Sequence, residues 1–251
     1  MKFLKNLNKF AFIFIILFVW FVISLFGIID PIFLSSPQET ILKLFQLLID
    51  GNIFLDIGAT LYRVFLGFIL GSIFGVISGI LIGHFVKLYN KLEFFIDFLR
   101  STPTPVLFPL FILFFGIGEF TKIIIIGWTS FLLLLINTSY GVKHSRKIRI
   151  TVAKLYKANK IQIFYKVLLP EALPHIFAGL RIAISHSLVV VLFIEMFIGT
   201  YTGIGHRILD AQQLFKTPEL YALIIIGSTL GYLINKIILI SENKILHWTK
   251  A

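Results

Sequence analysis

The sequence predicts an all-α integral membrane protein with about six transmembrane helices and a long cytoplasmic loop. Of its 251 residues, 58% are hydrophobic and only 14% are charged. No soluble domain keeps that much apolar surface away from water, so the chain belongs in a bilayer. Cysteine is absent, which excludes disulfides, thiolate chemistry and Cys-ligated metal sites.

Six apolar stretches are long enough to cross a bilayer as helices. Residues 10–29 hold no charge and follow Lys2, Lys5 and Lys9. This run is longer than the core of a signal peptide and has no Ala-x-Ala cleavage site, so we expect a retained first transmembrane helix. The other five predicted spans cover residues 61–83, 93–115, 121–141, 182–201 and 219–240.

A short helix is expected between the first two spans. Ser36 and Glu39 have the spacing of a capping box, and Pro37 stands at the first helical position. The pattern predicts a helix over residues 37–50. Its apolar residues place it at the outer membrane surface or against the bundle.

The second and third predicted spans each carry a backbone signal. In the third, Pro103, Pro105 and Pro109 interrupt helix hydrogen bonding and predict a bent or broken helix. In the second, glycines repeat every four residues along one helical face and permit very close helix approach. We expect packing within the chain in preference to a subunit interface for these glycines, which are Gly67, Gly71, Gly75, Gly79 and Gly83.

Loop charge orients the spans. Residues 142–166 contain eight lysines and arginines and no acidic residue. Because cytoplasmic loops are enriched in Lys and Arg, both termini and the 142–181 loop are predicted to face the cytoplasm. The same topology explains the net charge of +11, so no nucleic-acid partner is expected.

No catalytic motif is present in the sequence. We find no phosphate-binding Gly-rich loop with Lys-Ser/Thr, no His-Glu-x-x-His and no Gly-x-Ser-x-Gly. We therefore predict no catalytic residue, no metal site and no cofactor. Residues 116–122 predict a plain outer turn, in which Glu119 pairs at most with Lys122.

Glu195 is the most informative single residue, because it lies in the middle of an apolar span. A carboxylate at that depth costs several kcal/mol unless it faces the bundle interior or water. It either lines the transport pathway or serves as a buried structural partner for Arg181, Arg63 or a polar neighbour. Arg181 and His186 are further pathway candidates, although for His186, inside the same span, a packing role is the simpler explanation.

The segment Thr151–Pro170 is basic and compatible with helix, although it lies between long apolar runs. Helical stretches are predicted at residues 148–158 and 161–169, with Pro170 and Pro174 turning the chain back into the membrane. The loop between spans is about forty residues long, far longer than packing requires. A membrane protein that keeps such a segment in water is expected to contact a cytoplasmic partner with it.

The spacing of this segment resembles the coupling loop of ATP-binding-cassette importer permeases. That loop begins with Glu-Ala-Ala, continues with three residues and a Gly, and closes with Ile-x-Leu-Pro. Ala153 fits the second Ala, and the closing pattern is fitted by Val167, Leu169 and Pro170. Two positions depart from the pattern, because Thr151 replaces the Glu and Lys157 replaces the Gly. Thr151 is still expected to cap the coupling helix.

The resemblance extends over most of the chain. The sequence is similar to the nitrate/sulfonate/taurine branch of these permeases. The matching segments occur in order: LSSPQ at 34–38, TLYRVFLGF at 60–68, RSTPTPVLFPLFILFFGIGEFTK at 100–122, INTSYGV at 136–142, LLPEALPHIFAGLRIA at 168–183, EMFIGTYTGIG at 195–205 and His247-Trp248.

The resemblance implies one transmembrane permease domain over residues 1–251 of an inner-membrane importer. Its core helices would cover 61–240, including the coupling loop 142–181. A second permease copy, expected as a homodimer with a heterodimer left open, would complete the path for a small solute such as a sulfonate, taurine, nitrate or a thiamin precursor. An extracytoplasmic solute-binding protein would deliver the solute, and separate ATPase subunits would hydrolyse ATP, so the chain itself is not an enzyme.

The coupling loop is the implied ATPase contact. Ala153 and Leu155 are expected to pack against the ATPase, and Lys157 is expected to face its surface. Two alternatives are a stand-alone secondary transporter and a membrane scaffold. The long basic loop favours the importer subunit, because a secondary transporter more often shows internal repeats and several intramembrane charges, and a scaffold has no use for Glu195.

Overall fold

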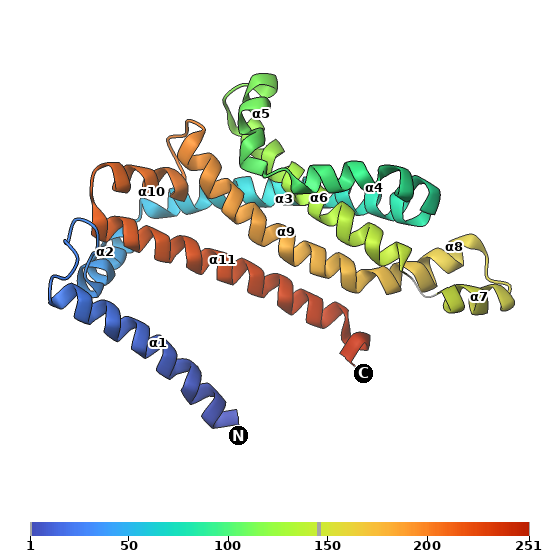
Figure 1. The fold of residues 1–251 in the computed structure, drawn as a ribbon, viewed down its shortest axis with the longest axis horizontal. Helices are drawn as coiled ribbons and strands as arrows, with labels where there is room; N and C mark the ends of the chain where they lie inside the picture. Colours follow the sequence, from blue (N-terminus) through green and yellow to red (C-terminus); the bar gives the residue numbers. More distant parts are fainter. Residues whose placement is uncertain (1, 145–146, 251) are drawn as a thin grey trace. The chain divides into compact units, whose positions relative to one another are not determined.

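The computed structural model describes residues 2–144 and 147–250, and every regular element in that part of the chain is helical. Figure 1 shows the helices coloured along the chain. The α-helices are α1 (Lys2–Leu25), α2 (Pro37–Asp50), α3 (Ile53–His84), α4 (Val86–Ser101), α5 (Phe108–Phe115), α6 (Glu119–Lys143), α7 (Lys147–Leu155), α8 (Lys160–Ile163), α9 (Leu169–Phe197), α10 (Ile204–Gln213) and α11 (Thr217–Ile245). Short irregular helices cover Thr104–Leu107, Phe164–Leu168 and His247–Lys250.

The chain divides into two compact units. The first comprises the described residues of Met1–Ala59 together with Tyr201–Thr229, and the second comprises Thr60–Thr200 with the described residues from Leu230 onward. Helices α3 and α11 each contribute to both units.

Helices α6 and α9 form the centre of the second unit and lie side by side (Figure 1). They run antiparallel: Gly141 lies against His175, Gly179 against Asn137, and the hydroxyls of Ser130 and Ser187 are 2.9 Å apart. The apolar core around them excludes the small voids that would weaken packing. Its most deeply buried members are Val64, Ile125, Ile126, Leu134, Ala183, Ile184, Val191 and Ile194.

Helix α3 packs against α6 through its glycine face, so the prediction of packing within the chain is confirmed. A Cβ atom added to any of the five glycines would lie 2.6–2.9 Å from the Cβ of a residue on α6, too close for any real side chain. No residue larger than glycine fits at these five positions without a shift, because the two backbones nearly touch. The pairs in order are Gly67–Ile126, Gly71–Ser130, Gly75–Leu134, Gly79–Thr138 and Gly83–Val142.

The proline-rich third span is bent, as predicted. Its two halves, Lys87–Ser101 and Thr104–Phe115, meet at 90°. Each proline removes a backbone N–H and places its ring against the preceding turn, so an α-helix cannot continue through the Pro103–Pro105 pair. A short 3₁₀ turn, Thr104–Leu107, fills the corner.

The predicted count of six spans is not confirmed in the described part of the chain. Four helices there are long and apolar enough to cross a membrane, or five if the bent pair is one span. The first predicted span lies in α1, which ends at Leu25, before the predicted limit at residue 29. The four long helices are Ile53–His84, Glu119–Lys143, Lys160–Phe197 and Thr217–Ile245.

The predicted turn at Pro170 and Pro174 is wrong. The helix that was expected to begin at residue 182 instead runs from Lys160 to Phe197. Pro170 lies in the first turn of α9, directly after a π-helical turn over Phe164–Leu168. The wider π turn shifts the backbone hydrogen bonds, with Leu169 N–H donating to the Phe164 carbonyl, and accommodates the missing proline N–H.

In the first unit, α2 begins with the predicted capping box. The Ser36 hydroxyl accepts a hydrogen bond from the Glu39 backbone N–H at 3.2 Å, and the Glu39 carboxylate accepts from the Ser36 N–H at 3.4 Å. The Trp20 indole N–H donates to the Ser35 carbonyl at 2.9 Å and its ring stacks on Tyr221. These contacts tie α1, α2 and α11 together within this unit.

Candidate functional site

The basic loop folds into two short helices with a defined corner between them. Helix α7 covers Lys147–Leu155, and a second helical stretch begins at Lys160. Asn159 starts this second stretch with its own capping box, because its side chain and that of Gln162 each accept a hydrogen bond from the other's backbone N–H, at 2.8 and 2.9 Å. The first predicted stretch is therefore present, shifted by one to three residues, and the second begins one residue early but continues to Phe197.

Helix α7 ends in a Schellman motif centred on Lys157. The Lys157 N–H donates to the Lys154 carbonyl at 2.9 Å, and the Ala158 N–H reaches back to the Ala153 carbonyl at 3.0 Å. Lys157 itself has φ of 58°, in the left-handed region. This region suits glycine, whereas another L-residue costs roughly 1–2 kcal/mol there. The glycine of the resembling permease loops thus has a backbone reason at this position, and Lys157 adopts the same conformation without it.

One face of α7 exposes apolar side chains. Ile148, Val152, Leu155 and Tyr156 follow the i, i+4, i+7, i+8 spacing of a helical face and all are exposed, with Leu155 at 78%. We call these four residues the α7 apolar face. Ala153 lies outside this face and is half-buried. Three of these residues belong to α7 and Tyr156 directly follows it, so the basic loop exposes an apolar patch at this end.

The other predicted loop residues take different places. Thr151 lies in the middle of α7, because the helix starts four residues earlier at Lys147; the expectation that Thr151 caps this helix is wrong. Val167 belongs to the π-helical turn, and Leu169 and Pro170 begin α9; all three are half-buried.

Glu195 lies in a buried ionic cluster that joins three helices of the second unit. Arg63 of α3 donates from Nη1 to a Glu195 carboxylate oxygen at 2.7 Å. The Thr60 hydroxyl lies within hydrogen-bond distance of both Glu195 oxygens, at 2.9 and 3.0 Å. Of the partners considered from the sequence, Arg63 is therefore the one that the structure provides.

Glu119 completes the cluster, and its contact with Arg63 was not predicted. Arg63 holds it with two parallel hydrogen bonds, from Nε at 2.7 Å and from Nη2 at 2.8 Å. Lys122 Nζ donates to the same carboxylate at 2.9 Å. The signal available in the sequence was Arg63 itself, since an arginine inside an apolar span requires carboxylate partners.

The cluster is electrically balanced and mostly sealed from solvent. Two cations, Arg63 and Lys122, face two carboxylates, Glu119 and Glu195. The side chains of Arg63, Lys122 and Glu195 are at most 3% exposed, whereas that of Glu119 is 50% exposed. Bidentate charge-assisted hydrogen bonds of this kind are the strong ones in proteins.

The other two pathway candidates do not join this cluster. Arg181 pairs with Glu242 of α11 at 3.3 Å, and both side chains keep contact with solvent. His186 is exposed on the outer face of α9, so nothing brings it to Glu195 in this structure.

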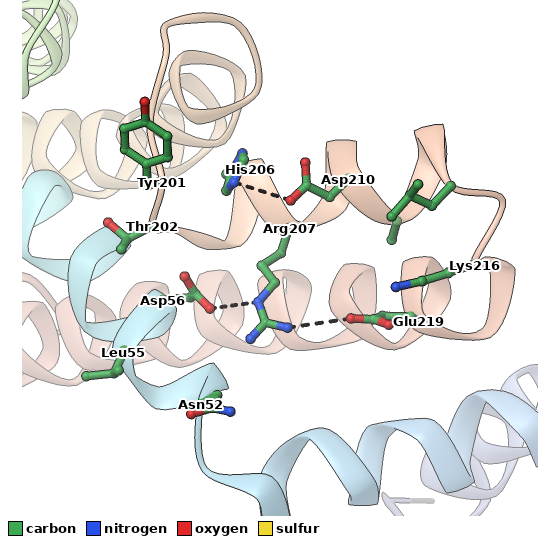
Figure 2. Close-up of a pocket in the computed structure, with 12 residues that line it drawn as sticks. Asn52, Leu55, Asp56, Tyr201, Thr202, His206, Arg207, Asp210, Lys216 and Glu219 are labelled. Carbon is green, nitrogen blue, oxygen red and sulfur yellow. Dashed lines mark hydrogen bonds and ion pairs between the residues drawn. The ribbon is translucent and has the colours of Figure 1, made fainter.

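A separate pocket lies in the first unit, with a volume of about 400 Å³. Figure 2 shows Arg207 between two carboxylates, Asp56 at 2.8 Å and Glu219 at 3.5 Å. Asp56 also accepts the backbone N–H of Gly203 at 2.8 Å, and His206 lies 3.2 Å from Asp210. Sequence reasoning did not identify this pocket, because its lining comes from three separate segments that carry no motif.

Comparison with known proteins identifies the family. Residues 67–246 match the family described as "Binding-protein-dependent transport system inner membrane component". The chain belongs to this family. It is therefore a permease subunit of an ATP-binding-cassette importer and a multi-pass inner-membrane protein. The chain is not an enzyme, and ATP hydrolysis takes place in a separate ATPase partner.

Curated relatives fall in the predicted branch. The chain is 32% identical to the "Putative aliphatic sulfonates transport permease protein SsuC" of Bacillus subtilis, over 94% of this chain and 86% of that protein. It is 27% identical to the taurine transport system permease protein TauC of Escherichia coli, over 93% and 86%. It is 32% identical to the nitrate import permease protein NrtB of Leptolyngbya laminosa, over 84% and 71%.

Solved structures share the fold. A chain of the MetNI methionine ABC transporter in an inward-facing conformation gives a TM-score of 0.65 at 20% identity, covering 80% of this chain and 95% of that one. A chain of a bacterial ABC transporter for the acidic polysaccharide alginate gives 0.67 at 15% identity, covering 98% and 100%. The fold of an importer permease is thus present over nearly the whole chain.

Proposed function

We propose that this permease forms, with a second copy of itself, the path of a small solute with an oxyanion group, such as a sulfonate, taurine or nitrate. The three named relatives that transport sulfonates, taurine and nitrate carry the substrate class. Both termini and the loop with α7 and α8 face the cytoplasm, as the Lys and Arg distribution favours. A solute-binding protein delivers the anion from the opposite side.

The observation that carries the coupling role is the α7 apolar face. Three exposed apolar side chains on a nine-residue helix, with Tyr156 directly after it, leave a patch that water solvates poorly. An ATPase groove that covers this patch turns nucleotide-driven closure into movement of the helix, and the continuous run from Lys160 to Phe197 carries that movement into the membrane. Ala153 and Leu155 contact the ATPase in this arrangement, and Lys157 faces its surface.

The docking assignment is tested by placing a charge in the contact. Leu155→Asp is expected to release the ATPase from the purified complex, and Ala153→Asp is expected to weaken ATPase binding. An unpaired desolvated charge in the contact costs roughly 2–4 kcal/mol of binding free energy. Thr151→Glu is the matched control, because it adds a carboxylate to the same helix at the position where resembling permeases carry Glu. Retention of the ATPase and of stimulated hydrolysis by Leu155→Asp would show that the docking surface lies elsewhere.

The orientation is tested by cysteine labelling, which the absence of natural cysteine makes free of background. A Cys at Gln38 is expected to react with an impermeant reagent in intact cells, and a Cys at Asn159 only after lysis. Labelling of the Asn159 variant in intact cells contradicts the topology.

The substrate class is tested by uptake into proteoliposomes that contain the permease, its ATPase and its binding protein. ATP-dependent uptake of taurine, methanesulfonate or nitrate supports the proposal. ATP-dependent uptake of a solute without an oxyanion group, in place of these three, overturns it. Cross-linking within the same preparation shows whether two copies of this chain form the dimer.

A further inference from the structure

The two carboxylates of the buried cluster have different surroundings. Glu195 is fully enclosed and is held by Thr60 and Arg63 Nη1. Glu119 is half exposed, and Arg63 and Lys122 provide its hydrogen bonds within the cluster. Glu195 is therefore a fixed counter-ion, whereas Glu119 can leave the cluster from its exposed side.

Removal of the Glu119 carboxylate would leave an uncompensated charge in the bundle. Of the four charged side chains of the cluster, two cations and one carboxylate would then remain, with one excess positive charge on side chains that are 3% exposed. A buried charge without a partner is strongly unfavourable. The position of the Glu119 carboxylate can consequently be vacated only in favour of water or of another anion, and an anion restores the balance.

The donors around Glu119 have the geometry of an oxyanion site. Arg63 Nε and Nη2 form a planar fork, with bond lengths of 2.7 and 2.8 Å, and Lys122 Nζ approaches one of the two oxygens at 2.9 Å. Sulfonate and nitrate present pairs of oxygens that such a fork binds as it binds a carboxylate. The position also lies at the first turn of α6, where the helix dipole favours negative charge.

We propose that Arg63 and Lys122 form a binding site for a small oxyanion, which the Glu119 carboxylate fills in this conformation. If the proposed function holds, the ligand is the transported anion, and Glu119 and the substrate occupy the site in alternation. Glu195 and Thr60 position the Arg63 guanidinium and keep the net charge of the empty site at +1.

The site is tested by thermal unfolding of the purified permease–ATPase complex, followed by tryptophan fluorescence. Glu119→Gln keeps the size of the side chain but removes its charge. At constant ionic strength in chloride, which has no pair of oxygens for the fork, the unfolding temperature of this variant is expected to fall by about 5 °C or more. Titration with nitrate or methanesulfonate is expected to restore it saturably, whereas the wild type, in which Glu119 competes, shifts much less.

Two further variants separate the site from general salt effects. Asp97→Asn removes an acid from an exposed pair, since Asp97 and Arg100 are both 57% exposed at 3.1 Å, and is expected to show no anion-specific shift. Glu119→Gln combined with Lys122→Gln rebalances the cluster, so it should fold in chloride and lose the response to nitrate and methanesulfonate.

Several results overturn the proposal. One is an anion response in Glu119→Gln no larger than that of the wild type or of Asp97→Asn. Another is an unchanged response in the double variant, which would locate the anion elsewhere. Failure to recover folded Glu119→Gln in either nitrate or chloride is a third, since nitrate should replace the missing charge. None of these measurements needs transport. The anion site can therefore be refuted while the uptake assay still supports the substrate class, and the reverse.

Discussion

Both units of the molecule place one arginine between two carboxylates, but they do so at different depths. In the second unit, Arg63 joins Glu119 and Glu195 and is 3% exposed. In the first unit, Arg207 joins Asp56 and Glu219 in a pocket and is 28% exposed. The charges and donor groups are the same, so the comparison isolates burial. An ion pair near water contributes little, whereas removal of one partner from a buried pair exposes the whole cost of an uncompensated charge.

The largest effect is expected for Arg63→Met. The variant removes the cation that faces the enclosed Glu195 carboxylate and should lose about 3–5 kcal/mol of stability. Thermal unfolding of the purified complex measures the loss. The combination Arg63→Met with Glu195→Gln removes both charges and should regain most of it; no recovery would mean that packing, and not charge, dominates at this position.

A smaller effect on stability, with a clear effect on transport, is expected for Glu195→Gln. The amide keeps the size and the hydrogen bond of the side chain, and Arg63 retains Glu119, so folding should survive. Uptake should fall, because the cluster then carries an excess positive charge that holds an anion too tightly. Uptake by membrane vesicles with matched permease levels decides: a rate equal to wild type would assign Glu195 a purely structural role.

Arg207→Met tests the other side of the comparison. Asp56 keeps the Gly203 N–H and Glu219 keeps Lys43 at 3.6 Å, and solvent reaches the pocket. The expected loss is about 1 kcal/mol, near the value for exposed pairs. A loss as large as that of Arg63→Met in the same unfolding assay would show that exposure is not what separates the two sites.

The smallest effects concern a second feature that both units share. Helix α10 ends like α7, with Phe215 at φ of 52° and hydrogen bonds from Phe215 and Lys216 back to Gln212 and Ala211. Lys157→Gly and Phe215→Gly should each raise stability by about 0.5–1 kcal/mol, because both side chains are exposed and glycine removes the left-handed strain. Lys157→Ala, which keeps Cβ, should show no gain. A loss of ATPase binding in Lys157→Gly would instead indicate a direct contact by the lysine.

Local chemistry made much of the fold predictable. The capping box at Ser36, the glycine face of α3 and the break at Pro103 each follow from residues close together in the sequence. Pro170 shows the limit of that reasoning. A proline at the start of a helix preceded by a π turn does not break it, and the sequence carries no separate sign of the π turn.

The ionic cluster was predictable only in part. The cost of a carboxylate in an apolar span explains why Glu195 is buried, and Arg63 was among its expected partners. Glu119 was assigned to a simple turn because its local neighbour Lys122 already provided a partner. Its bond to Arg63, across 56 residues, depends on how three helices pack. Such a contact follows from tertiary structure and has no local pattern.

The glycine face of α3 has a consequence for the alignment of the bundle. Its five contacts pair residues at a constant separation of 59, and both partner rows repeat every four residues. A surface with that period fits itself again after a shift of one step, about 6 Å along the axis. The glycine face therefore brings α3 and α6 close without selecting one register between them. Such a shift would break the bonds from Arg63 to Glu119 and Glu195. The charged cluster therefore fixes the register of α3 against α6.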